Sequence, residues 1–489
     1  MRKVLNCPFG RRLCSSKASD HDHELTTSTF NVMTGAKGTI RLTERRDIRP
    51  KKIPRIYSLP SEALNGFYNV LQGSERIPKQ LQHEADQLTN KIIHRKMPAD
   101  PEEVRLARKT NNMRHYKWRP MAFQTREECA GYALSRLPGN YAEAKFVLDQ
   151  LDLDDFSPES ILDYGSGIGG VFWAAREKWD NSLRDYCCVD PNVEMNHLAM
   201  DIMRGPDSKL IAPYVNFRRT MVPSPRVTYD IVVAQRVLPE LPSSNSRIDL
   251  ISMLWSKTNK YLILIESNLL DSFTSLMNIR DFVLTAGFNF DIPGLAKKLK
   301  IEGKLDAETD EILRDRRASP YEKYCLLKKK IQISTEIAPG HVFAPCPHDS
   351  GCPLSTGRGY SEPCAFEAKI PEIRVDGKTR SKHEDRTLRS KFTYLILKKG
   401  ERTVGQKALP RILKINHCGK HVQCKACTAF DGLQRFTVSR KDGHVFNRIR
   451  TVKEGHLLPF HVCFYHLYSP PKVLTPLLTR SKMYQFGPN

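Results

Sequence analysis

The chain has 489 residues, too many for one compact core and enough for two or three domains. Its 77 Lys and Arg residues against 54 Asp and Glu residues give a formal net charge of +23, which favours a polyanionic partner, nucleic acid first. The alternative is a merely basic soluble protein. No apolar run approaches the roughly 20 residues of a membrane-spanning helix, so we expect no membrane insertion.

The first residues are basic and contain Ser but no acid before Asp20, a pattern typical of a mitochondrial presequence. We expect residues 1–16 to be this presequence and localisation to be the mitochondrial matrix. A basic tail that binds RNA would look similar. Residues 17–120 are interpreted as a basic extension with short helices. Its segment 105–119 combines basic and aromatic side chains, which suits phosphates and unpaired bases, although a solvated helical face is an equal alternative.

Residues 121–335 are predicted to form a doubly wound α/β domain. Apolar residues recur at helical spacing from Arg126 to Leu151, which predicts a helix pair. Strands and helices then alternate, an order that indicates a parallel sheet covered by helices on both faces. The expected strands are Ser160–Tyr164, Tyr186–Asp190, Asp230–Ala234 and Tyr261–Ile265, with helices from Val171, from Val193 and over Ile248–Thr258. The charged stretch 297–335 is expected to be a helical connector.

A glycine-rich turn follows the first predicted strand and precedes a helix. It reads Asp163-Tyr-Gly165-Ser-Gly167-Ile-Gly169, a tighter spacing than the dinucleotide fingerprint and typical of methyltransferases. Glycine allows the backbone to approach a ligand, and Asp163 would orient the loop and the methionine part of that ligand. Asp190 ends the second strand, where its carboxylate can accept both ribose hydroxyls. We therefore expect a Rossmann-like S-adenosylmethionine methyltransferase fold, the alternative being purely structural glycines.

Catalysis is not predicted as clearly as cofactor binding. The third strand is followed by Val237-Leu-Pro-Glu240-Leu-Pro242, which is no amino-methyltransferase motif, and this domain has no paired catalytic cysteines. Cys187 and Cys188 lie inside a predicted strand and are interpreted as core residues. Whether the chain is an active S-adenosylmethionine-dependent methyltransferase therefore stays open, and no catalytic residue is assigned.

Residues 336–489 are rich in Pro, Cys and His and are expected to form a small cysteine-rich C-terminal domain. The chain has 13 cysteines, too few for a disulfide scaffold, and those of this region suit metal ligation in a reducing compartment. The spacing of Cys346, Cys352 and Cys364 does not resemble paired zinc knuckles, whereas Cys424 and Cys427 form one C-x₂-C pair. An iron–sulfur cluster, zinc and unligated core cysteines all remain possible.

Several segments together resemble one known family, that of the mitochondrial small-subunit factor Rsm22, over about residues 125–460. The most specific is Ala344-Pro-Cys346-Pro-His348-Asp349, which continues to Cys352-Pro353. The others are Tyr132–Pro138, Leu162–Gly167, Trp173–Trp179 and Val189–Pro191.

The resemblance implies a mitochondrial assembly factor that binds the immature small ribosomal subunit through its rRNA, supports mitochondrial translation, and acts beside other assembly factors. It also implies an S-adenosylmethionine pocket and a [4Fe-4S] cluster on Cys346, Cys352, Cys364 and Cys427, with Cys424 as the substitute for the fourth ligand. The chain departs from the family at Glu266-Ser267-Asn268, where the family has Glu-Pro-Gly, and this departure puts methyl transfer in doubt. The alternative function is methylation of small-subunit rRNA or of a ribosomal protein.

Overall fold

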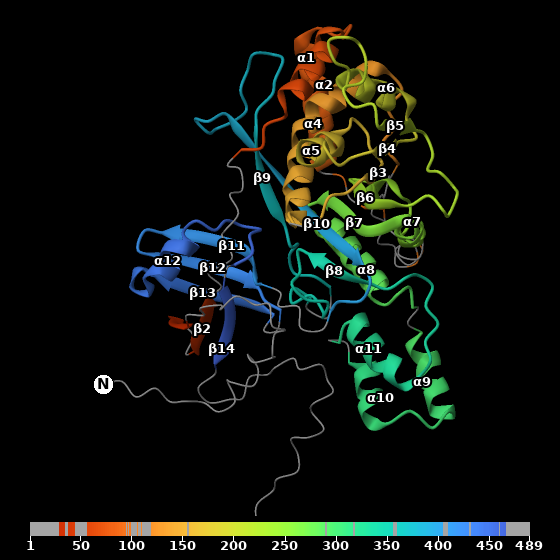
Figure 1. Ribbon diagram of the computed structural model, residues 1–489, viewed down its shortest axis with the longest axis vertical. Coiled ribbons are helices and arrows are strands. Elements are labelled where there is room, and N and C mark those ends of the chain that lie inside the picture. The colour runs from red at the N-terminus through yellow and green to blue at the C-terminus, as the bar shows by residue number, and fades with distance from the viewer. Residues whose placement is uncertain are drawn as a thin grey trace, which may run out of the picture.

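The structure is a computed structural model, shown in Figure 1. It describes the strands at 29–34 and 38–44 and residues 56–465, apart from gaps at 94, 96, 99–104, 106–108, 110–118, 154–155, 289–290, 316–317, 356–358, 404–408, 430–431 and 459. The expected presequence and nearly all of the basic aromatic segment lie outside the described residues.

An eight-stranded sheet is the centre of the fold, with the order β5-β4-β3-β6-β7-β10-β8 and β9 paired to β10. The strands from β5 to β7 are parallel, and their order around β3 is that of a doubly wound Rossmann sheet. Their bounds are β3 Ser160–Tyr164, β4 Asp185–Val189, β5 Val215–Arg218, β6 Tyr229–Gln235 and β7 Thr258–Ser267. The four strands expected from the sequence are all present.

The sheet continues beyond the boundary expected at residue 335. Strand β10 (Thr387–Lys399) pairs antiparallel with β7 and also with β8 (Gly340–Ala344) and β9 (Phe366–Pro371). The result is a Rossmann sheet of the methyltransferase type, with the antiparallel strand β10 inserted near one edge. This confirms the expected Rossmann-like fold class. The run Phe392–Leu397, expected in the C-terminal domain, instead lies within this sheet because both faces of β10 are buried there.

Helices cover the two faces of the sheet. One face packs against α4 (Arg126–Leu148), α5 (Gly170–Trp179) and α6 (Val193–Ile202), and the other against α7 (Ser244–Ser256) and α8 (Leu270–Leu284). The helix pair expected over 126–151 is one long helix, α4, followed by a single turn. Thr125 and Glu128 form a capping box at its start, and its internal Pro138 does not end it.

The N-terminal extension contains strands as well as helices. Strands β1 (Thr29–Thr34) and β2 (Gly38–Glu44) form a hairpin, and β2 also pairs with β14 (Phe460–Tyr465) from the other end of the chain. Helices α1 (Ser61–Gln72) and α2 (Pro78–Ile93) contact α6 and α4, respectively. Among the described residues of this extension, which was expected to be helical, β1 and β2 are strands and α1 and α2 are helices.

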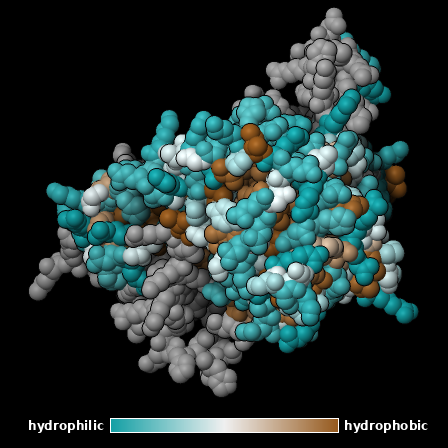
Figure 2. All heavy atoms as spheres, turned by 90° about the horizontal axis from the view of Figure 1, so that it is seen from above, coloured by the Kyte–Doolittle hydropathy of each residue, from teal (hydrophilic) through white to brown (hydrophobic). Residues whose placement is uncertain are grey.

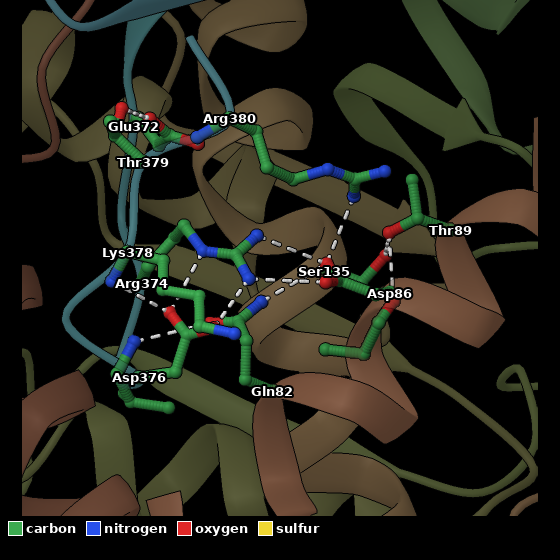
Figure 3. A network of polar contacts seen from close by, with 12 residues as sticks. Gln82, Asp86, Thr89, Ser135, Glu372, Arg374, Asp376, Lys378, Thr379 and Arg380 are labelled. Carbon is green, nitrogen blue, oxygen red and sulfur yellow. Dashed lines mark hydrogen bonds and ion pairs between the residues drawn. The ribbon is translucent and has the colours of Figure 1, made fainter. Parts of the chain in front are cut away.

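A polar clamp joins α2 to the loop between β9 and β10. The Arg374 guanidinium lies between the carboxylates of Asp86 on α2 and Asp376 in the loop, at 3.1 and 2.7 Å (Figure 3). Arg380 forms a second ion pair with Asp86, and Gln82 accepts a hydrogen bond from the Val375 amide. Segments nearly 300 residues apart are joined in this way.

Two smaller units project from the sheet (Figure 1). The first contains α9 (Ile292–Ile301), α10 (Ala307–Arg314) and α11 (Pro320–Lys330), where a helical connector was expected. The second is a sheet of β11 (Arg411–Cys418), β12 (His421–Cys427) and β13 (Leu433–Ser439), covered by α12 (His444–Ile449) and containing its own apolar core. We call this second unit the C-terminal sheet.

The surface shown in Figure 2 is mostly hydrophilic, with small scattered groups of hydrophobic residues. Among the described helices, none has the length and apolarity needed to cross a bilayer.

Candidate cofactor loop and cysteine site

The glycine-rich turn connects β3 to α5 at the carboxyl edge of the sheet. Gly165, Gly167 and Gly169 all have positive φ, at 70°, 51° and 77°, conformations that residues with a Cβ rarely adopt. A Cβ at Gly165 would lie 2.5 Å from the Val237 side chain, whereas one at Gly167 would meet nothing closer than 3.9 Å. Gly165 therefore has no room for a side chain, whereas a Cβ would fit at Gly167, where only the positive φ favours glycine.

Asp190 follows β4 and faces this turn. Its Oδ2 accepts a hydrogen bond from the Gly167 amide at 3.0 Å, and its Oδ1 accepts one from the Asn192 amide at 2.9 Å. Burial raises the pKa of Asp190, and both amide bonds lower it. The structure thus brings together the loop and the acid that the sequence predicted to form one site.

Asp163 lies beneath the turn and is fully buried. The Tyr186 hydroxyl donates to its Oδ2 at 3.1 Å, whereas its Oδ1 is buried without a hydrogen-bond partner. Burial raises the pKa of Asp163 to about 7. The Asp163 side chain therefore packs beneath the glycine-rich turn.

A buried ion-pair network lies next to the turn. Glu143 on α4 is fully buried and accepts from Arg236 at 2.6 and 3.3 Å, and Arg136 lies 3.4 Å away. Burial alone would raise the pKa of Glu143, but the two arginines and their hydrogen bonds outweigh it and lower that pKa. Arg236 has φ of 62°, a strained conformation for a non-glycine residue. Sequence analysis had no signal for Glu143, whose partners are distant in the chain.

The four predicted cysteine ligands lie in one neighbourhood between the main sheet and the C-terminal sheet. Cys346, Cys352 and Cys364 all pack against the apolar cluster between the main sheet and α8. Burial first, and then the other three thiols, raise the pKa of Cys427 well above its usual value. The raised pKa of Cys364 likewise has burial, Cys346 and Cys352 as its first three causes.

Cys424 and Cys427 point to different environments because they are three positions apart on β12. Cys424 is buried in the separate core of the C-terminal sheet, and burial alone raises its pKa, to about 12. Cys427 lies with the other three thiols. This arrangement favours Cys427 over Cys424 as the fourth cysteine of the group that includes Cys346, Cys352 and Cys364.

The Pro-Cys-Pro-His-Asp block shapes the loop around these thiols. The imidazole Nε2 of His348 lies 3.3 Å from Cys427 Sγ, and burial lowers the pKa of His348 to about 4, so the ring is neutral near pH 7. Asp349 accepts two hydrogen bonds from Arg402, at 2.6 and 3.0 Å, and one from the Val342 amide. His348 therefore touches the site, and Asp349 fixes the loop.

Two buried arginines flank the cysteines, and sequence analysis predicted neither. Arg280 on α8 is 1% exposed and donates to the carbonyls of His348 and Ser350, at 3.3 and 2.6 Å. Its Nε is buried without a partner. Arg411 on β11 donates to the Pro345 carbonyl at 2.6 Å. Positive charge thus lies on two sides of the thiols, and both arginines lower the pKa of Cys346 against the effect of burial.

Within the described residues, no three His, Cys, Asp or Glu side chains are placed to hold a single metal ion.

These features define a class: a Rossmann-like methyltransferase fold that continues into a small C-terminal sheet, with three partly buried cysteines and the buried Cys427 close together. Residues 126–294 and 323–459 match the family described as mitochondrial small ribosomal subunit Rsm22. The chain belongs to this family, as its sequence motifs predicted.

A curated relative is the human protein called ribosome assembly protein METTL17, mitochondrial, which is 27% identical over 442 residues, covering 83% of this chain and 84% of the relative. Two solved methyltransferases are also similar. The Synechocystis magnesium protoporphyrin IX enzyme is 14% identical with a TM-score of 0.23, covering 40% of this chain and 78% of its own. The plantazolicin enzyme BpumL is 12% identical with a TM-score of 0.25, covering 68% and 100%. These two similarities are too weak to bear on the cofactor.

Proposed function

We propose that this protein is a mitochondrial assembly factor of the small ribosomal subunit, that it binds the subunit's rRNA, and that it holds a [4Fe-4S] cluster and S-adenosylmethionine in separate sites. Family membership and the human relative's name support the ribosomal and mitochondrial parts. The net charge of +23 supports RNA as the partner.

The single observation that supports the cluster best is that Cys427 of β12 lies with Cys346, Cys352 and Cys364 of an earlier segment, next to the buried cation Arg280. Four uncompensated thiolates would be unstable in such an environment, and raised pKa values show that burial disfavours their ionisation. A cluster would keep them ionised, and Arg280 and Arg411 would offset its negative charge. When bound, the cluster supplies a rigid cross-link between the main sheet and the C-terminal sheet.

The residues of the glycine turn fit S-adenosylmethionine. A Cβ at Gly167 would meet nothing closer than 3.9 Å, and Asp190 presents a carboxylate at the neighbouring strand end. In this proposal Asp163, Gly165 and Gly169 hold the turn in shape, Gly167 lines the ligand, and Asp190 accepts the ribose hydroxyls. The bound cofactor would supply a transferable methyl group.

Anaerobic purification followed by iron, sulfide and zinc analysis tests the cluster. We expect roughly four irons and four sulfides per chain with absorbance near 400 nm. If the protein contains one zinc and no sulfide, the site is a zinc site and the cluster proposal is wrong. If it contains no metal, the proposal of any metal site there is wrong. Sedimentation with small subunits from cells lacking the protein tests the assembly role, and we expect association that weakens between about 50 and 200 mM salt.

Methyl transfer is the second candidate function, favoured by the contact between Asp190 and the Gly167 amide. Labelled S-adenosylmethionine incubated with native precursor subunits would deliver label to rRNA or to a ribosomal protein, and Asp190→Ala would abolish it. If the protein associates with the subunits but transfers no label, methyl transfer is excluded and only the binding role remains.

A further inference from the structure

A hollow of about 280 Å³ lies at the free end of the C-terminal sheet, away from the cysteine site. Its lining comes from the ends of β11 and β12, the turn between them, α12 and the residue after that helix: His417, Cys418, Gly419, His421, Val422, Phe446 and Arg450. His417 and Val422 are partners in the strand register, and Phe446 and Arg450 are one helical turn apart. The hollow is smaller than most cofactor pockets and of a size for one planar ring system.

The lining is chemically suited to a flat heterocycle. Phe446 is 3% exposed and forms part of the wall, and the Arg450 guanidinium lies 5.5 Å from the centre of its ring. Arg450 is exposed and has no ion-pair partner among the described residues, so its planar face is available for stacking. His417 and His421 can donate to or accept from the edge of a base.

Cations that can meet phosphates surround the hollow. Lys420 is exposed at the tip of the turn, and Arg440 lies beside it, since the Arg440 amide donates to the Lys420 carbonyl at 3.0 Å. Neither has an ion-pair partner in the described part of the chain. The C-terminal sheet, α12 and the segments next to that helix contain further basic residues, including Lys414, Arg435, Lys441, Arg448 and Lys453.

We propose that this hollow binds one unpaired base of ribosomal RNA, with the neighbouring cations on the flanking phosphates. The inference rests on the proposed rRNA binding and names a contact within it. A paired base is stacked inside a helix and cannot enter a concave site, so recognition is of single-stranded RNA. An acidic peptide would meet the same surrounding cations, but its carboxylates offer no flat ring to fill a hollow lined by Phe446 and Arg450.

Equilibrium binding of the full-length protein to two labelled RNAs, single-stranded and fully paired, each roughly 12 nucleotides long, tests the proposal. Arg450→Gln and His417→Ala are expected to weaken binding of the single strand about tenfold, the loss typical of one stacked base. Duplex binding by Arg450→Gln should stay within about twofold of that by Lys414→Gln, and duplex binding by His417→Ala within about twofold of that by the unaltered protein. The control for Arg450→Gln is Lys414→Gln, which removes one positive charge outside the hollow and should weaken both RNAs alike.

Crosslinking of a 4-thiouridine-containing single strand gives an independent readout, expected on the peptides containing 417–422 or 446–450. Equal effects of all three variants on both RNAs, with crosslinks elsewhere, would overturn the base site while leaving rRNA binding intact. Failure of the unaltered protein to bind either RNA at low salt would instead refute the proposed rRNA binding.

Discussion

Arg280 donates a hydrogen bond of 2.6 Å to the main-chain carbonyl of Ser350, inside the loop between Cys346 and Cys352. The same guanidinium bonds the His348 carbonyl and forms an ion pair with Asp281. One buried cation on α8 therefore holds the shape of the loop that contains two of the proposed ligands.

Replacing Arg280 by Met is expected to lower the free energy of unfolding by roughly 3 to 5 kcal/mol, because the partly buried Asp281 carboxylate and two main-chain carbonyls lose their partner. Iron content should fall as well, since the loop and the compensating charge are both lost. Arg280→Lys should give an intermediate result, because it restores the charge without the planar donor group. Urea unfolding and iron analysis measure these effects, and wild-type values for Arg280→Met would show that the arginine is dispensable.

Cys427→Ala is expected to abolish iron binding, whereas Cys424→Ala should retain it. The two residues occupy the same strand but face different environments, so the pair forms a matched comparison. The Cys424 variant should cost only about 1 kcal/mol of stability through a small cavity. Iron per chain after anaerobic purification decides the matter. Loss of iron from the Cys424 variant with retention in the Cys427 variant would reverse the ligand assignment.

Asp163→Asn should stabilise the folded protein more at about pH 8 than at about pH 5. The pKa of Asp163 is raised to about 7 in the folded state, from 3.8. Its contribution to stability is therefore complete below pH 3.8 and is lost as the pH rises through 7. The asparagine cannot ionise, so its advantage should grow over this window by about 2 to 4 kcal/mol.

Urea unfolding of the protein without added cofactor measures this difference. Asp207→Asn, at an exposed turn, serves as the control and should show no such trend. An Asp163→Asn advantage that is independent of pH would mean that Asp163 is ionised throughout.

Arg374→Ala should loosen α2 without unfolding the main sheet, because Arg374 joins that helix to the β9–β10 loop (Figure 3). Amide hydrogen exchange in α2 is expected to accelerate about tenfold, equivalent to about 1.4 kcal/mol of local stability. Lys382→Ala changes an exposed residue of the same loop and should leave exchange unaltered. Unchanged exchange in the Arg374 variant would show that apolar packing alone holds α2.

The parts of the fold that local sequence determined are those with strong periodicity. The apolar run Tyr261–Ile265 was predicted within the correct strand, because a strand buried on both faces is almost uniformly apolar. The glycine turn after Tyr164 was predicted at the correct position because a positive φ favours glycine. The cysteine-rich block likewise carried enough family-specific residues to indicate the family, which the comparisons confirmed.

Long-range pairing decided what the sequence left open. Strand β10 belongs to the main sheet because it pairs with β7, more than a hundred residues earlier, and no local pattern encodes that partner. Only the folded chain separates Cys424 from Cys427, since opposite faces of one strand look alike until their neighbours are known. In the sequence, Arg280 and Glu143 looked like ordinary charged residues of helices. In the fold both are buried, and each pairs with groups from distant segments because a buried charge without partners is unstable.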